Sequence, residues 1–370
     1  MSFSRVILEI STAALRSNFA AVRRLARSCR VAAVIKANAY GTGELQTGAL
    51  LRDAGASRFA VADLNEACRV EKLGLPVQIL GTLLPDEAGE VVRRGYLAPV
   101  TGIESAKILS AEAVRQQRAV NCQLKVDTGM GRFGMDCKTA LSEIFEISRL
   151  PGLEIKGLYS HFSSAGTPGN DYTLMQIERF KQLYQQLAEA GISFEDVHTS
   201  ASNGICFYPE ACSDPFTLVR SGIIMYGCER EHLASGSVFQ SVLSLKSRLA
   251  AVKKIRKGEG IGYGHTFTLP ENALVGTIPA GYADGVPLAL SNAGSVLIKG
   301  VRCPVIGRVS MDCTTVLLDG VPDAQAGDEV IFWGRSGNEE ISVCDWADLK
   351  NTHAHDILCA IGNRVERRFI

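Results

Sequence analysis

Short apolar segments alternate with longer amphipathic segments along the first 226 residues, and this alternation constrains the fold more than any other feature. The apolar segments have the length of strands, and most precede a segment whose apolar residues recur at helical spacing. Eight strands are expected at residues 31–36, 58–62, 77–81, 97–100, 120–126, 154–161, 195–200 and 217–226. Helices are expected at residues 44–54, 65–73, 86–94, 104–118, 138–149 and 172–190, so only the seventh strand lacks a long helix after it.

Eight strands at this spacing predict a parallel (β/α)8 barrel of the TIM type. An open doubly wound sheet is the alternative, because a strand count from sequence is easily wrong by one or two. The open sheet would favour a glycine fingerprint after its first strand. Neither GxGxxG nor a P-loop is present there, so the barrel is the preferred interpretation.

The pattern changes beyond about residue 235, where short β-rich segments are separated by Gly, Pro and Asp. We expect the barrel to cover residues 11–235 and a mostly antiparallel β domain to cover residues 236–370. A helix capped by Ser11 separates the first strand from the barrel, so residues 1–10 are expected to join the β domain. The β-rich segments are residues 242–255, 273–279, 294–306, 314–318 and 328–333.

Composition excludes several classes of protein. The formal net charge is zero, which disfavours binding to nucleic acids or membranes through a basic surface. No apolar run reaches the length of a membrane span, and the first residues lack the features of a signal peptide. The eleven cysteines form no CxxC pair, so we expect a cytoplasmic protein without disulfides or a bound metal. His353 and His355 lack matching ligands and are expected in a surface turn.

Polar residues follow several of the expected strands at their carboxyl ends, where the active sites of barrels lie. A lysine there can form a Schiff base with pyridoxal phosphate, and an Asp or Arg can face the pyridine nitrogen. Barrels commonly hold phosphate near the loops after strands seven and eight, which here contain residues 202–204 and 222–223. The polar residues are Lys36, Lys125, Asp127, Arg132, His161, His198, Ser200, Ser202 and Arg220.

Seven motifs along the chain resemble the alanine racemase family, and they occur in the family's order. They are AVIKANAYG, KVDTGMGRFG, SHF, RSGIIMYG, IGYGHTF, IPAGYADG and GRVSMD. The resemblance covers essentially the whole chain, including the β domain. It implies a pyridoxal 5'-phosphate enzyme that racemises L-alanine and D-alanine and supplies D-alanine for peptidoglycan.

The resemblance also implies roles for individual residues. Lys36 carries the cofactor and acts as the acid or base on one face of the substrate, and Tyr263 acts on the other face. Arg220 faces the pyridine nitrogen, and His161 hydrogen-bonds Arg220. The residues that match the phosphate-binding set are Tyr40, Ser202, Gly222 and Ile223.

The residues that the resemblance implies around the substrate come from both domains. Arg132 matches the arginine beside the substrate carboxylate, and Lys125 matches a lysine that is carbamylated in many members. A carbamate would orient Arg132, whereas two close cations would repel each other. Met311 and Asp312 match a pair at the entrance of the site. In the family, these two residues and the tyrosine come from the second subunit of a homodimer.

The sequence departs from the family pattern at three places, and three alternative functions remain open. The chain reads YGTG where YGHG is frequent, and Ser310 stands where a cysteine is frequent. Asn363 stands where strict alanine racemases often have tyrosine, so we expect better handling of serine. The alternatives are a racemase of broader specificity, a basic amino-acid decarboxylase that uses the same cofactor, and a non-catalytic protein that binds pyridoxal phosphate.

Overall fold

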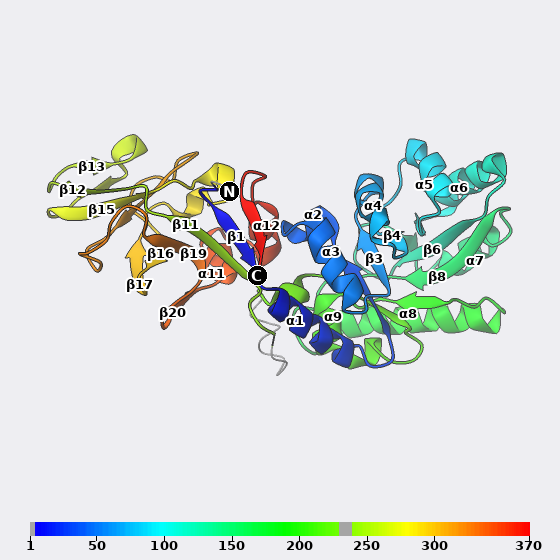
Figure 1. The fold of residues 1–370 in the computed structure, drawn as a ribbon. Coiled ribbons are helices and arrows are strands. Elements are labelled where there is room, and N and C mark those ends of the chain that lie inside the picture. The colour runs from blue at the N-terminus through cyan, green and yellow to red at the C-terminus, as the bar shows by residue number, and fades with distance from the viewer. Residues whose placement is uncertain (1–3, 229–238) are drawn as a thin grey trace.

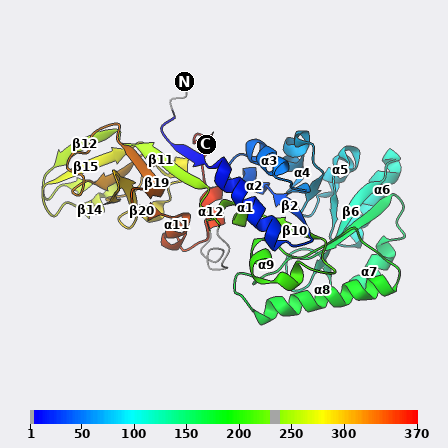
Figure 2. The ribbon, with the colours of Figure 1, turned by 60° about the horizontal axis from the view of Figure 1, so that its bottom comes forward.

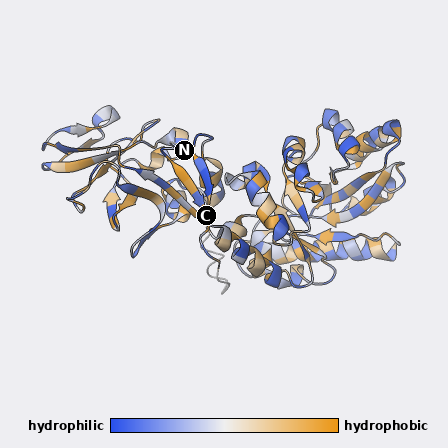
Figure 3. Ribbon diagram, in the orientation of Figure 1, coloured by the Kyte–Doolittle hydropathy of each residue, from blue (hydrophilic) through white to orange (hydrophobic). Residues whose placement is uncertain are grey.

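The computed structural model describes residues 4–228 and 239–370, which form two parts that lie side by side (Figure 1). The barrel occupies one side and the β-rich part the other, and both chain termini lie near the junction. The domain boundary expected at residues 235 and 236 falls outside the described residues. Figure 3 shows polar and apolar residues alternating along the elements of both parts.

Eight parallel strands close into a barrel, which confirms the predicted fold class. Their hydrogen-bonded order is β10-β2-β3-β4 and β5-β6-β8-β9. The N–H of Leu97 donates to Val77 O at 2.9 Å and joins β4 to β5, and the N–H of Arg220 donates to Ser200 O at 3.0 Å beside β9. The strands are β2 (Arg30–Val34), β3 (Arg58–Val61), β4 (Val77–Ile79), β5 (Ala98–Val100), β6 (Val120–Asp127), β8 (Leu153–Tyr159), β9 (Asp196–His198) and β10 (Leu218–Ser221).

Helices surround the barrel, and Figure 2 shows the long helix α8 along its outer face. Side chains cap several of them, because the first N–H groups of a helix lack partners within it. Ser11 accepts from the N–H of Ala14 in α1, and Asp63 accepts from Glu66 in α4. The helices are α1 (Thr12–Leu25), α3 (Glu44–Asp53), α4 (Leu64–Val70), α5 (Ala88–Arg94), α6 (Ile103–Gln116), α7 (Ala140–Ile147), α8 (Asp171–Glu189) and α9 (Ser202–Phe207).

The β-rich part has one large sheet of order β17-β16-β19-β11-β1-β21 and a smaller sheet of order β12-β15-β18. Strand β1 (Ile7–Ile10) lies antiparallel to β11 and parallel to β21 (Glu366–Phe369), so both ends of the chain enter this sheet. The remaining strands include β11 (Leu243–Arg248), β12 (Ala251–Ile255), β13 (Gly260–Ile261), β14 (Phe267–Thr268), β15 (Ala273–Ile278), β16 (Ser295–Ile298), β17 (Val301–Pro304), β18 (Thr314–Leu317), β19 (Glu329–Ser336) and β20 (Glu339–Ile341).

Several expected strands are shorter or divided in the structure. The segment 217–226 ends as a strand at Ser221 and continues as a 3-10 turn, and the segments 242–255 and 294–306 each form two strands. Two short helices, α11 (Val343–Leu349) and α12 (Ala354–Cys359), were not expected in the β-rich part. In the described part of the chain, no helix is long and apolar enough to cross a membrane.

Candidate active site

A cavity of about 560 Å³ opens at the carboxyl ends of the barrel strands. Its lining comes from residues far apart in sequence, as expected for the mouth of a barrel. Nine of the residues singled out from the sequence line it together. They are Lys36, Tyr40, Lys125, Arg132, His161, Ser202, Arg220, Gly222 and Ile223.

Lys36 begins a left-handed turn directly after β2, labelled α2 (Lys36–Tyr40). The next four residues all have φ between 51° and 57°, and none of them is glycine. A left-handed conformation costs roughly 1–2 kcal/mol for each such residue. The turn places both Lys36 and Tyr40 at the cavity, and it needs external support to persist.

Contacts from three other segments support this turn. The buried Glu66 carboxylate accepts from the N–H of Ala37 at 2.6 Å and from Ala62 at 2.7 Å. The Tyr226 hydroxyl donates to Ala39 O at 2.9 Å. From the last strand, Arg367 Nε donates to Gly41 O at 2.9 Å. The strained backbone is therefore held by parts of both domains.

Four cations line the cavity: Lys36, Lys125, Arg132 and Arg220. Burial, followed by the positive charge of Arg132, lowers the pKa of the Lys36 amine. Burial and the charges of Arg220 and Arg132 lower the pKa of Lys125 to about 8. Both amines are therefore more readily neutral than exposed lysines, and a neutral amine can act as a base or a nucleophile.

Arg220 is buried beneath the cavity and is bound by imidazoles and carbonyl groups, without a carboxylate. Its Nη2 donates to Ser160 O at 2.8 Å, to Thr199 O at 2.9 Å and to His161 Nδ1 at 3.2 Å. Its Nη1 contacts His198 Nδ1 and also lies 3.4 Å from His198 O. No acceptor among the described residues lies within hydrogen-bond distance of its Nε. Burial lowers the pKa of Arg220 to about 10, so the guanidinium stays protonated at neutral pH.

The loop that carries Arg132 is organised by the carboxylate of Asp127 at the end of β6. This carboxylate accepts from the N–H groups of four successive residues, 129–132, at distances between 2.7 and 3.2 Å. These hydrogen bonds hold the pKa of Asp127 below its usual value against the opposing effect of burial. Asp127 therefore shapes the loop, which the sequence alone indicated only as a polar strand end.

Small residues after β9 and β10 form a cradle of hydroxyl and N–H groups. Ser202 Oγ accepts from the N–H groups of Gly222 and Ile224, each at 3.3 Å. A β-carbon on Gly222 would lie 2.3 Å from the Tyr40 hydroxyl oxygen. Glycine is therefore required for the close approach of these groups, which together suit an anion.

The β-rich part carries a second hollow of about 560 Å³, lined by Tyr263, Met311 and Asp312 together with Tyr282 and Leu288. None of these residues lines the barrel cavity. Tyr263 is 72% exposed and Met311 is 52% exposed. Arg364 donates to Asp312 Oδ1 at 2.8 Å, to Met311 O at 3.3 Å and to Asp284. Within one chain, these candidate residues form a separate, exposed group.

Comparison with known proteins identifies the family. The family model of the alanine racemase N-terminal domain matches residues 10–230, and that of the C-terminal domain matches residues 242–369.

This chain belongs to the alanine racemase family.

Relatives and solved structures are similar to this chain over nearly its whole length. An alanine racemase of Desulforamulus reducens is 37% identical over 98% of both chains, and one of Symbiobacterium thermophilum is 36% identical over 97% of this chain and 95% of the relative. The crystal structure of alanine racemase from Streptomyces lavendulae superposes with a TM-score of 0.92 at 30% identity, covering 100% and 98% of the two chains. That of the Bartonella henselae enzyme, described with covalently bound pyridoxal phosphate, has a TM-score of 0.89 at 26% identity, covering 99% and 100%.

The residues of the barrel cavity fit the cofactor of the alanine racemases. The cradle around Ser202 and Gly222 offers donors to a phosphate, and the lysine with the lowered pKa lies in the same cavity. Arg220 Nε, which has no acceptor among the described residues, is a donor left for a ring nitrogen. The non-catalytic alternative, which lacks a β domain, is excluded because both family models match.

The expectation for His353 and His355 was wrong. His353 directly precedes α12 and His355 lies within it, and both line the barrel cavity instead of forming a surface turn. The His355 ring lies 5.8 Å from the Tyr40 ring. No motif indicated this position, because it depends on the packing of α12 against the left-handed turn. Residues 4–228 and 239–370 contain no group of three or more potential metal ligands.

The sequence-based prediction missed one residue that supports the site and placed another at the wrong depth in the barrel. Glu66, which binds the turn after Lys36, lies in a helix and showed no motif of its own. His198 was expected at the mouth, but it is fully buried below Arg220 and does not line the cavity. Asn363 is exposed and does not line the cavity either.

Proposed function

We propose that this chain interconverts L-alanine and D-alanine with pyridoxal 5'-phosphate and supplies D-alanine for peptidoglycan. The observation that carries the proposal is the convergence of Lys36, the Ser202 cradle and Arg220 on one cavity. Basic amino-acid decarboxylases place a carboxylate at the ring nitrogen of the cofactor. This chain has Arg220 in the corresponding role, so its site differs from theirs. Bound cofactor would withdraw electrons from the substrate and so acidify the hydrogen on its α-carbon.

Within this proposal, Lys36 holds the cofactor covalently, and the other residues of the cavity bind and orient it. Tyr40, Ser202, Gly222 and Ile223 surround the phosphate, Arg220 donates to the ring nitrogen, and His161 supports Arg220. Arg132 binds the substrate carboxylate. Lys125 reacts as a neutral amine with carbon dioxide, losing a proton to give a carbamate that pairs with Arg132. The lowered pKa of Lys125 supports this step.

Racemisation requires proton transfer on both faces of the α-carbon. In one direction the Lys36 amine takes the α-proton from one face while the Tyr263 hydroxyl donates a proton to the opposite face, and in the other direction the roles are exchanged. Tyr263→Phe removes the donor on one face. We expect it to lower turnover by about 10²–10⁴-fold in both directions, and retained activity would refute the two-base scheme.

Tyr263, Met311 and Asp312 would then act on the barrel cavity of a second copy, making a homodimer the active form. Their exposure and their separation from the cavity of their own chain support this arrangement. Mixing inactive Lys36→Ala with inactive Tyr263→Phe subunits, with exchange of subunits, should restore about a quarter of the normal activity. No recovery in verified mixed dimers would show that the tyrosine acts within its own chain.

Serine is a further candidate substrate, because Asn363 is small and can hydrogen-bond a hydroxyl group. Asn363 directly precedes Arg364, which contacts Met311 and Asp312, so it lies at the group that would meet the partner cavity. Purified protein incubated separately with L-alanine, L-serine and L-lysine, followed by measurement of each D-isomer, tests the activity. Serine turnover no better than that of Asn363→Tyr would contradict the role of Asn363.

We also propose a cytoplasmic location. The cysteines that the structure describes form no disulfide, which suits a reducing compartment. Fractionation of cells that express the natural protein, with racemase activity measured in each fraction, tests this location.

A further inference from the structure

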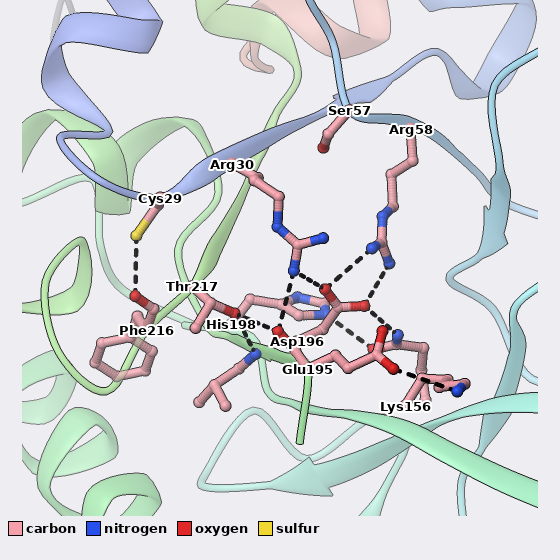
Figure 4. A network of polar contacts seen from close by, with 12 residues as sticks. Cys29, Arg30, Ser57, Arg58, Lys156, Glu195, Asp196, His198, Phe216 and Thr217 are labelled. Atoms are coloured by element: carbon pink, nitrogen blue, oxygen red, sulfur yellow. Dashed lines mark hydrogen bonds and ion pairs between the residues drawn. The ribbon is translucent and has the colours of Figure 1, made fainter. Parts of the chain in front are cut away.

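A chain of polar side chains runs through the barrel interior, and Figure 4 shows the part of it around Asp196 and His198. Asp196 at the start of β9 accepts from Arg58 Nη1 at 2.7 Å and from Arg30 Nη2 at 2.6 Å. Gln123 of β6 joins Asp196 to His198, with distances of 2.7 Å and 3.2 Å, and His198 contacts Arg220. The chain therefore links the two arginines of β2 and β3 to the arginine at the cavity.

The chemistry of the partners fixes the direction of every hydrogen bond in this chain. The Asp196 carboxylate, held between two guanidinium groups, only accepts, so the amide nitrogen of Gln123 must face it. Gln123 Oε1 then faces His198 Nε2 and only accepts, so Nε2 carries the hydrogen. Burial and the charge of Arg220 lower the pKa of His198 well below its usual value, so the ring is neutral. Its Nδ1 is therefore left with a lone pair aimed at Arg220.

Two further observations show that this arrangement is built into the barrel. The Tyr159 ring stacks on the His198 ring at 5.0 Å with an interplanar angle of 12°. Stacking fixes the plane of the imidazole but allows a half-turn about the Cβ–Cγ bond, which leaves the ring in the same plane, so Gln123 selects between the two orientations. A β-carbon on Gly157 of β8 would lie 2.1 Å from Gln123 Oε1, so the neighbouring strand leaves room for this amide.

The orientation of His198 matters because it decides which N–H of Arg220 remains available. In the observed orientation Nη1 is taken by His198 and Nη2 by His161 and two carbonyl groups, and Nε–H is left for the cavity. A half-turn of the imidazole about its Cβ–Cγ bond would place Cδ2–H where Nδ1 now faces Arg220, and Cε1–H where Nε2 now faces Gln123. A carbon-bound hydrogen cannot accept, so Arg220 Nη1 would lose its acceptor, which is unfavourable for a buried donor, and Arg220 would shift to find another.

We propose that Gln123 and Asp196 are positioning residues of the racemase, which lock the orientation of His198 and thereby aim Arg220 Nε–H at the cofactor ring. The inference rests on the proposed function, where Arg220 is assigned to the ring nitrogen. Neither Gln123 nor Asp196 touches the cavity, so both act only through His198.

The first test measures the ring nitrogens of His198 in the unaltered holoenzyme by 15N NMR of histidine-labelled protein, with His198→Asn for assignment. We expect a protonated Nε2 and an unprotonated Nδ1, unchanged between about pH 6 and 9. A protonated Nδ1, or a doubly protonated ring, would overturn the proposal. This measurement does not depend on the reaction, so it stands apart from a failure of the proposed function, which would appear as no D-alanine formed by the unaltered enzyme.

The second test compares Gln123→Met with Gln78→Met. Both replace a fully buried glutamine of a barrel strand, but the Gln78 amide has no hydrogen-bond partner in the structure. We expect Gln123→Met to lower kcat/KM for L-alanine about tenfold to a hundredfold, with the larger part in kcat, and Gln78→Met to remain within about twofold.

The decisive readout is the Nε–H signal of Arg220 in 15N-arginine-labelled protein. Addition of pyridoxal phosphate to the cofactor-free form should shift this signal in the unaltered protein and in Gln78→Met, and shift it less in Gln123→Met. An equal shift and equal activity in Gln123→Met would overturn the proposal. If Gln123→Met does not fold, the ring-nitrogen measurement in the unaltered enzyme still decides the orientation of His198.

Discussion

The barrel cavity and the hollow of the β domain differ in how far one chain completes them. The cavity residues are mostly buried, and hydrogen bonds within the same chain hold Arg220 and the turn after Lys36 in place. In the β-domain hollow, Tyr263 and Met311 stand largely exposed. Exposed apolar side chains grouped around a hollow are typical of a surface that meets a partner. The difference teaches that the chain builds the barrel cavity largely from its own residues and presents the β-domain hollow outward, as the proposed homodimer would require.

Substitution of Lys36 should cause a larger loss of activity than any other change to either hollow. Lys36→Ala should lower racemisation by about 10⁴-fold or more, because in the proposed mechanism it removes both the covalent attachment and one of the two proton-transferring groups. The β-domain hollow should be unaffected, so the variant should still dimerise. D-alanine formation and sedimentation are the measurements. Substantial activity in Lys36→Ala would place the chemistry elsewhere than in the barrel cavity.

The loop contact at Asp127 tests whether the barrel half is preorganised by its own chain. Asp127→Asn replaces an acceptor oxygen with a donor and removes up to half of the four hydrogen bonds to residues 129–132. We expect kcat/KM for alanine to fall about tenfold to a hundredfold as Arg132 moves. Asp136→Asn, an exposed aspartate just beyond the same loop, is the control. Equal kinetics for the two variants would show that the loop needs no such anchor.

The loss of activity caused by a substitution in the β-domain hollow should depend on protein concentration. Leu288 is 47% exposed and lines the β-domain hollow. Leu288→Asp should weaken the dimer and lower activity about tenfold in dilute enzyme, with recovery at high protein concentration. Val114→Asp, an exposed apolar residue of α6 on the outside of the barrel, is the control. A loss of activity that does not vary with concentration would break the comparison between the two halves.

The close cations of the barrel cavity should make the free energy of unfolding depend on pH. The pKa of Lys125 is lowered to about 8, so the folded state binds fewer protons than the unfolded state between about pH 8 and the usual lysine pKa. In buffer free of carbon dioxide, Lys125 should therefore destabilise the fold below about pH 8, and this effect should fade as the pH rises towards about 10. Urea unfolding of the unaltered protein and Lys125→Met at several pH values measures it, and a constant difference would contradict the prediction.

Most of the fold was predictable because it follows from periodicity. All eight barrel strands were expected within a few residues of their observed positions, since each is a short apolar segment next to a helical pattern. The boundaries were less accurate where a strand gives way to a turn, as at Ser221. Apolar residues continue there, but the backbone turns out of the sheet, and composition does not record that change.

The site was predictable where its residues lie in recognisable motifs, and not where tertiary packing decides. Lys36 and Arg220 lie in such motifs near strand ends, Ser202 follows the seventh expected strand, and all three line one cavity. His355 and Glu66 reach the site through helices α12 and α4, whose sequences carry no local signal of that contact. The orientation of His198 depends on contacts between four barrel strands, which no single segment of sequence reveals.

The left-handed turn after Lys36 gains its supporting contacts at different times during synthesis of the protein. Every barrel strand has been synthesised once residue 221 is complete, but one support of the turn, the hydrogen bond from Arg367 to Gly41 O, comes from a residue 326 positions later in the sequence than Gly41. The strain of four left-handed residues, roughly 1–2 kcal/mol each, opposes the turn until that support arrives. A chain still on the ribosome therefore has its barrel sequence before it has its working lysine. A residue of the β domain thus completes the support of a turn in the barrel.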